Sequence, residues 1–177
     1  MKRTGVVRRI DELGRIVIPK EIRKTLRMKE GESLEIFLDH EEDIVLKKYS
    51  SMHSLSDFAQ KFADSMGRYI KHTIVITDTD KVLASSGERK KKYLNKNISE
   101  ALLKSIQRRE EILENYEKEF EIVEENKEEG TYAMSTIIVN GDVIGSILLI
   151  SDGEDLKESD FQFIKIASSF FEKYLEE

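Results

Sequence analysis

The sequence predicts an α+β chain of two domains, and three observations lead to this fold class. Residues 1–50 alternate short β-branched runs with one short amphipathic segment, in the order β-β-α-β-β. Residues 53–177 carry longer elements in the order α-β-β-α-β-β-β-α, which is typical of an antiparallel sheet flanked by helices. The segment KKYSSMHS at 47–54 separates the two patterns. We therefore expect a first domain over 1–52 and a second over 53–177.

The first domain begins with an expected hairpin followed by a helix. TGVVRRI (4–10) and RIVI (15–18) are typical of strands, and Gly14 between them suits a turn that needs a positive φ. Pro19 is the only proline of the chain; it ends the second strand and fits the first turn of a helix. KEIRKTLRM (20–28) then predicts a short amphipathic helix.

Two further strands, SLEIFL (33–38) and IVLKKY (44–49), complete the first domain. A unit of this size rarely builds a sufficient core from one chain, and this one has no disulfide or Cys ligands for a metal. Oligomerisation is the remaining route to stability. The size alone therefore predicts that strands of two chains complete one barrel.

The second domain is expected to open with a connecting helix over 53–70, whose apolar residues recur at three- and four-residue steps. Two strands within 73–87, a helix over 97–113 and a strand over 119–126 should follow. The last two strands lie within 131–152 and are joined by Asn-Gly, the strongest short hairpin signal.

The closing helix, 156–177, is apolar on two sides and must therefore be covered on two sides. One face carries Phe161, Ile164, Ser168, Phe171 and Leu175, and the other carries Phe163, Ile166, Phe170 and Tyr174. We expect the face with Phe163 to pack on the sheet. The face with Phe161 should meet another subunit, together with the 53–70 helix. The residues predicted for this oligomer interface are Leu55, Phe58, Phe62, Met66, Phe161, Ile164, Phe171 and Leu175.

Positive charge is concentrated at the start of an acidic chain. The formal net charge is -6, yet residues 1–29 hold ten Lys or Arg side chains against three acids. Such a local field favours an anionic partner, and a solvated surface with compensating charges is the plainer alternative. Arg suits bidentate contact with phosphate and with the guanine edge in the major groove. A twofold dimer would present two matching basic surfaces to a duplex.

Candidates for catalysis are few. The three histidines lack a metal-ligand spacing, and there is no Cys nucleophile, phosphate-binding loop or dinucleotide motif. DHEED (39–43) and TDTD (77–80) collect carboxylates, but a solvated hairpin tip and a turn explain them better. We expect no enzyme, no metal and no cofactor.

Cysteine usage and hydropathy bear on location. The absence of Cys excludes a disulfide-stabilised extracellular protein and favours the cytoplasm. No apolar run is long enough for a signal peptide or a membrane span, so no membrane partner is expected.

The stretch DELGRIVIPKEIR, within a match over residues 2–49, resembles the AbrB-type DNA-binding domain of Firmicute transition-state regulators. This resemblance implies a swapped-hairpin barrel formed by an intertwined homodimer that binds double-stranded DNA. The family's DNA-contacting positions fall on Arg8, Arg15, Arg23 and Lys24, with Lys2 and Arg9 as further phosphate contacts. Lys24 departs from the commoner Arg-Arg pair, which favours a phosphate contact there over base readout.

The combination of this domain with a C-terminal domain of this length is similar to regulators that act in the developing forespore. It implies a GAF-like second domain, a homotetramer built as a dimer of dimers, and both activation and repression of sporulation genes. GAF domains often bind small molecules beside the sheet. Whether this one does, and which ligand, stays open, as does a purely structural role.

Two other functions remain at this point. The same N-terminal fold occurs in antitoxins that repress their own genes, although a long, well-patterned second domain argues against that role. A small-molecule sensor whose basic surface binds a protein is the other. Salt-dependent binding to a duplex distinguishes the regulator from the sensor.

Overall fold

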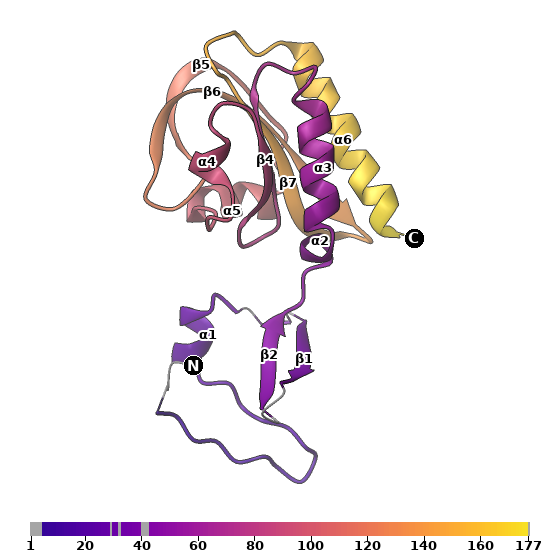
Figure 1. Cartoon of the computed structure of the whole chain (residues 1–177). Coiled ribbons are helices and arrows are strands. Elements are labelled where there is room, and N and C mark those ends of the chain that lie inside the picture. Colours follow the sequence, from indigo (N-terminus) through magenta and orange to yellow (C-terminus); the bar gives the residue numbers. More distant parts are fainter. Residues whose placement is uncertain (1–4, 29, 32, 40–42, 177) are drawn as a thin grey trace. The chain divides into compact units, whose positions relative to one another are not determined.

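The computed structural model describes residues 5–28, 30–31, 33–39 and 43–176, and the chain divides into two compact units, Met1–Tyr49 and Ser50–Glu177 (Figure 1). The N-terminal unit contains a short helix and one antiparallel strand pair. These elements are α1 (Lys20–Thr25), β1 (Leu34–Leu38) and β2 (Ile44–Lys48). The helix and the two later strands of this unit lie where the sequence predicts them.

The two strands expected first in the chain do not form within one chain. The described residues of 4–10 and all of 15–18 belong to no strand or helix. A tight turn at Gly14, with φ of 76°, does reverse the chain as predicted. The arms that leave the turn do not form strands, because a strand needs a partner for its backbone groups and none is present among the described residues beyond the turn.

The end of α1 is fixed by backbone hydrogen bonds. Met28 N–H donates to Arg23 O at 2.7 Å, and Arg27 N–H donates to Lys24 O at 3.2 Å. Arg27 adopts a positive φ of 53°. This pattern is a Schellman motif, which satisfies carbonyl groups at a helix C-terminus and stops the helix. The helix therefore ends with its basic pair, Arg23 and Lys24, in its last turn.

The N-terminal unit has almost no core of its own. Among its described residues only Pro19 is buried. Its large apolar side chains are exposed instead, which is unusual for a stable domain. They are Val6, Val7, Ile10, Leu13, Ile16, Val17, Leu26, Ile36, Phe37, Leu38, Ile44 and Tyr49.

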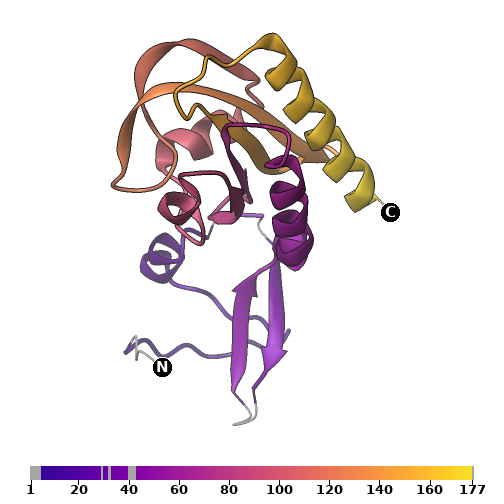
Figure 2. The same ribbon diagram turned by 45° about the horizontal axis from the view of Figure 1, so that its top comes forward.

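The C-terminal unit is built around a five-stranded antiparallel sheet with strand order β4-β3-β7-β6-β5. Three longer helices and two single-turn helices lie on both sides of this sheet (Figure 2). The strands are β3 (Thr73–Thr77), β4 (Val82–Ser86), β5 (Ile112–Glu121), β6 (Lys127–Val139) and β7 (Asp142–Ile150). The helices are α2 (Ser51–Ser54), α3 (Ser56–Met66), α4 (Lys90–Tyr93), α5 (Glu100–Gln107) and α6 (Glu158–Glu176).

Each face of the sheet has its own apolar core. Because side chains alternate along a strand, Ile74 and Ile76 of β3 pack under α3 and α6, while Val75 packs under α4 and α5. Both faces of β3 and most of β7 are therefore buried. This explains why TIVIT and SILLI are continuous apolar runs and not alternating ones.

Close packing between β7 and β3 depends on a glycine. A Cβ placed on Gly145 would lie 2.0 Å from the carbonyl oxygen of Thr77, well inside any real contact distance. The Asn-Gly signal also holds, since Asn140 and Gly141 have φ of 51° and 86° between β6 and β7. These two backbone features fix how β7 leaves β6 and passes β3.

The helix predicted over 97–113 is shorter in the structure. Ser99 caps it by accepting a hydrogen bond from Leu102 N–H, and the helix ends at Gln107. Arg109 has a positive φ of 58°, which breaks the helical path. Ile112 and Leu113 then belong to β5, so this strand starts earlier than the predicted 119.

The closing helix packs on the sheet with the face that was expected to meet another subunit. Ile164 and Phe171 are fully buried against the sheet, whereas Ile166 is 70% exposed. Phe171 and Ile164 belong to the core under α3, and neither can face another subunit without unfolding this unit. Sequence periodicity showed two apolar faces but not which of them the sheet takes.

Candidate nucleic-acid interface

The basic residues predicted to bind DNA lie on three parts of the N-terminal unit. Arg8 and Arg9 lie on the extended arm before the Gly14 turn, and Arg15 follows that turn. Arg23 and Lys24 occupy the last turn of α1. All five are exposed. Lys2, the sixth predicted contact, lies outside the described residues.

The turn that carries Arg15 is a three-residue hairpin loop. Gly14 N–H donates to Asp11 O at 2.9 Å, and Asp11 N–H donates to Arg15 O at 3.0 Å. A type I turn followed by a glycine with positive φ gives this geometry. The sequence DELGR encodes it directly, because Asp favours the first turn position and Gly the left-handed one.

The Asp11 carboxylate connects the turn to the Arg15 side chain. Its Oδ1 accepts from Leu13 N–H at 3.0 Å and from Arg15 N–H at 2.8 Å. Its Oδ2 accepts from Arg15 Nε at 2.8 Å. These backbone and side-chain hydrogen bonds from Arg15 hold the pKa of Asp11 below its ordinary value. Asp11 was not among the residues singled out from the sequence, although its position opposite Arg15 in the turn was a signal.

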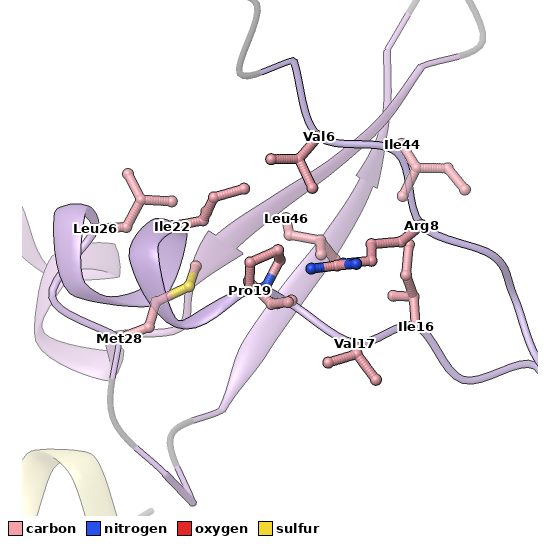
Figure 3. A pocket seen from close by; sticks show the side chains of 11 residues that line it. Val6, Arg8, Ile16, Val17, Pro19, Ile22, Leu26, Met28, Ile44 and Leu46 are labelled. Carbon is pink, nitrogen blue, oxygen red and sulfur yellow. The ribbon is translucent and has the colours of Figure 1, made fainter.

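An apolar groove of about 310 Å³ lies beside these basic residues (Figure 3). Its lining combines the extended arms, α1 and β2. Arg8 is its one charged lining residue, and its side chain lies over the apolar lining in Figure 3. The lining residues are Val6, Arg8, Ile16, Val17, Ile18, Pro19, Ile22, Leu26, Met28, Ile44 and Leu46.

The predicted oligomer interface of the C-terminal unit divides in two. Met66, Ile164 and Phe171 are buried in the chain's own core. The other five, Leu55, Phe58, Phe62, Phe161 and Leu175, are half-buried.

The exposed apolar stripe on α6 consists of the residues that were expected to pack inward: Phe163, Ile166, Phe170 and Tyr174. It continues onto α3 through ring stacking (Figures 1 and 2 show α3 and α6 side by side). Phe62 and Phe170 stack with centroids 5.6 Å apart, and Phe58 and Tyr174 with centroids 4.9 Å apart. We call the four exposed α6 residues with Phe58 and Phe62 the α3–α6 aromatic face.

A second polar arrangement is internal and structural. The buried Glu128 carboxylate accepts from Tyr93 Oη at 2.6 Å and lies 2.6 Å from Lys92 Nζ and 3.1 Å from Arg89 Nη1. Burial alone would raise the pKa of Glu128, but the hydrogen bonds from Lys92 and Tyr93 outweigh it and hold that pKa below its ordinary value. The Asp152 carboxylate, 3.0 Å from Arg89 Nε, compensates the second positive charge. These contacts tie α4 to β6.

Of the two acidic motifs, the structure describes all of TDTD (77–80) but only part of DHEED (39–43). Asp78 of TDTD organises the turn after β3, since its Oδ1 accepts from Asp80 N–H and Lys81 N–H, both at 2.7 Å. This is the turn role predicted for it. Most of DHEED lies outside the described residues.

Comparison with known families now adds to this geometry. Residues 54–176 match the model described as stage V sporulation protein T C-terminal, transcription factor. Residues 7–52 match the model described as antidote-toxin recognition MazE, bacterial antitoxin. The two matches together define a bacterial transcription factor with an AbrB- or MazE-like N-terminal domain.

Individual relatives agree with this class. The chain is 42% identical to stage V sporulation protein T of Bacillus subtilis (strain 168) over 178 residues, covering 100% of both chains. It is 59% identical to the transition state regulatory protein AbrB of the same organism over 49 residues, covering 28% of this chain and 50% of AbrB. The chain belongs to the stage V sporulation protein T family. The resemblance to AbrB-type regulators drawn from DELGRIVIPKEIR is thereby confirmed.

One solved structure has a similar shape. It is a type II free methionine-R-sulfoxide reductase from Thermoplasma acidophilum, with a TM-score of 0.49 and 13% identity over 68% of this chain and 94% of the reductase. A likeness of this degree carries no argument about function.

Within the described part of the chain, no helix combines the length and the apolar composition of a bilayer span.

Proposed function

We propose that this protein is a DNA-binding transcription regulator of sporulation genes that acts in the cytoplasm of the forespore, as activator and repressor. The observation that carries the proposal is the exposed basic cluster of Arg8, Arg15, Arg23 and Lys24 on the unit that resembles AbrB. Family membership supports the sporulation role. Phosphate neutralisation by these side chains supplies affinity, and arginine forks supply base readout.

The DNA-binding form is a homodimer in which two N-terminal units share one swapped-hairpin barrel. The unit has a single buried residue and an apolar groove of about 310 Å³ in one chain. The unpaired arms at 5–10 and 15–18 have strand-forming sequences and no partner strand among the described residues of the chain. A second copy supplies both missing parts, since its arms pair with these arms and fill the groove.

Within that dimer the basic residues differ in role. Arg15 projects from a tight turn and Arg23 from the last turn of α1, so both suit base contacts. Lys24 is a point charge without a planar fork and suits a phosphate. Arg9 and Lys2 add phosphate contacts. Arg8 borders the apolar groove, which places its contact at the edge of the shared barrel.

The C-terminal unit joins two such dimers into a homotetramer through the α3–α6 aromatic face. Ile166 is 70% exposed in the middle of this face. Exposed aromatic patches of this kind are typical of protein–protein interfaces. Phe170→Asp should yield dimers in light scattering while the far-UV circular dichroism spectrum stays unchanged. A variant that remains tetrameric would locate the tetramer interface elsewhere.

The domains of this proposal are 1–52 and 53–177, and the second domain has a GAF-like fold. The connector predicted as one helix over 53–70 consists of two helices, α2 and the longer α3, which ends at Met66. The antiparallel sheet of the second domain, with helices on both faces, supports a GAF-like fold. A cavity of about 150 Å³ lies between α5, β5 and β6. No residue in it identifies a ligand, so the domain is assigned an assembly role and its ligand is left open.

The decisive experiment measures duplex binding by fluorescence anisotropy over a salt series, with the full-length protein. Arg15→Ala and Arg23→Ala should each weaken binding by about 1–3 kcal/mol. Arg108→Ala is the matched control, because it removes one exposed positive charge from the C-terminal unit and should leave affinity nearly unchanged. No binding at low salt, or equal losses for Arg15→Ala and Arg108→Ala, would refute the proposal.

An antitoxin that represses its own gene is the second candidate, favoured by the MazE match over 7–52. Antitoxins usually end in a short segment that folds on the toxin, whereas residues 50–177 form a packed unit with two cores. A toxin-like gene beside this one would revive that candidate.

A further inference from the structure

An acidic residue lies inside the basic cluster, and its charge opposes DNA binding. Asp11 is separated from Arg15 by only the three loop residues of the turn. A carboxylate close to phosphate is repelled by it, so a purely electrostatic account predicts that removing Asp11 would tighten binding. The neighbouring Glu12 has the same charge and provides a natural comparison.

The two acids differ in what they contact. Asp11 accepts three hydrogen bonds, two from the backbone of Leu13 and Arg15 and one from Arg15 Nε. Within the described part of the chain, the Glu12 side chain makes no hydrogen bond or ion pair. Both are exposed, so burial does not separate them.

The ion pair uses the inner nitrogen of the guanidinium. Asp11 Oδ2 binds Arg15 Nε at 2.8 Å, and neither terminal nitrogen of Arg15 has a partner among the described residues. The Arg15 side chain is 72% exposed. The Nε contact restricts the side-chain torsions of Arg15, while its two terminal NH₂ groups have no partner in the described part of the chain. Those groups are the ones that donate to a phosphate or to the O6 and N7 atoms of guanine.

We propose that Asp11 is a positioning residue for DNA recognition, which builds the turn through Oδ1 and orients Arg15 through Oδ2. The proposal rests on the function proposed above, since it assigns Arg15 to the duplex. Preorganisation of Arg15 lowers the entropy lost on binding, and this gain exceeds the repulsion between Asp11 and the duplex.

The inference is tested by whether removal of the Asp11 charge weakens or tightens binding to the duplex. Asp11→Asn keeps an oxygen for the two backbone hydrogen bonds but places an NH₂ group or a weaker acceptor opposite Arg15 Nε. It should weaken duplex binding by roughly 3- to 10-fold, a part of the loss expected for removing Arg15 itself. Glu12→Gln should tighten binding or leave it unchanged. An Asp11→Asn variant that binds as tightly as Glu12→Gln or the wild type would overturn the proposal.

A double-mutant cycle shows whether Asp11 acts through Arg15. In the Arg15→Ala background, Asp11→Asn should no longer weaken binding, because the residue it orients is gone. A loss that persists there would overturn the proposal, since it would arise from the turn alone. The amide NMR signals of Gly14 and Arg15 report whether the turn is intact in each variant; if Asp11→Asn perturbs them, Asp11→Ser, which keeps an acceptor for the turn, replaces it in the cycle.

The same assay separates this inference from the proposed function. Wild-type protein that fails to bind any duplex at low salt removes the function itself. Wild-type protein that binds, with Arg15→Ala weakened and Asp11→Asn strengthened, keeps the function and removes the positioning role.

Discussion

The two units of this chain bury their apolar residues very differently. The C-terminal unit encloses one apolar core on each face of its sheet, and its central strand β3 is buried along its whole length. The N-terminal unit exposes most of its large apolar residues and has one buried residue among those described. Apolar burial is the main stabilising term in folding, so the first unit resembles half of a domain. The difference shows that one chain builds the core of the C-terminal unit, and it supports the proposal that two chains complete the N-terminal one.

The largest effect should come from the core of the C-terminal unit. Phe171→Ala removes a fully buried ring and should lower the free energy of unfolding by about 3–5 kcal/mol. Phe170→Ala, the next residue, removes a ring that is half-exposed within one chain and should cost about 1 kcal/mol through lost stacking in that chain. Any further loss from the proposed tetramer contact should depend on protein concentration. Urea unfolding followed by circular dichroism at low protein concentration compares the two variants. Equal losses under that condition would mean that α6 is rotated from its position here.

Ile16→Ala tests whether the N-terminal unit completes its core with a second chain. In a single chain Ile16 is 53% exposed, and its truncation would cost little. In a shared barrel it is buried, and the loss should reach about 2–4 kcal/mol. Leu13→Ala, in the exposed turn, is the control. Unfolding of the N-terminal unit should also depend on protein concentration, and an Ile16→Ala variant with wild-type stability at every concentration would argue for a monomeric unit.

Gly145→Ala tests the packing of β7 against β3. The added methyl group would overlap the Thr77 carbonyl, so the strands must separate locally. We expect a loss of about 1–3 kcal/mol in the free energy of unfolding. Gly153→Ala is a useful contrast because nothing lies within 4 Å of its Cβ position, although its φ of 105° adds backbone strain. Thermal unfolding of both variants separates steric overlap from strain.

The smallest effect concerns acid stability and the buried Glu128. Its folded-state pKa lies below the ordinary value of 4.5, so its carboxylate stabilises the fold above that pH. This contribution is lost as the pH falls through the lowered pKa. Glu128→Gln should cost about 1–2 kcal/mol at pH 7 and less at pH 3, because the wild type has by then lost part of the same interactions. A cost that does not change between pH 7 and pH 3 would contradict this role.

Local signals predicted the C-terminal sheet well. The continuous apolar runs of β3 and β7 and the Asn140-Gly141 turn all appear in the structure. The helix α5 lies within the predicted range, but the strand β5 begins seven residues before the predicted start at 119. The reason is that Arg109 adopts a positive φ, which ends the helical path. Glycine usually marks such a position in a sequence, and here the residue is an arginine.

Two features depended on packing that periodicity does not encode. The helix α6 has two apolar faces, and only the shape of the sheet decides that Phe171 packs inward and Phe170 outward. The role of Asp11 depends on a hydrogen-bonded turn, where spacing alone suggested merely a compensating charge. The basic residues proposed to bind DNA were selected from charge and resemblance alone, and the structure shows that those described are exposed.

The edge strand β5 bears on the tendency of this protein to aggregate at high protein concentration. An edge strand offers unpaired backbone groups to any other strand, which is the usual start of fibrous aggregation. In β5 the register with β6 shifts between Glu114 and Lys118, and the segment is rich in charged side chains. A broken, charged edge is a poor template for another strand. At high protein concentration this edge should therefore resist pairing with an edge strand of another molecule.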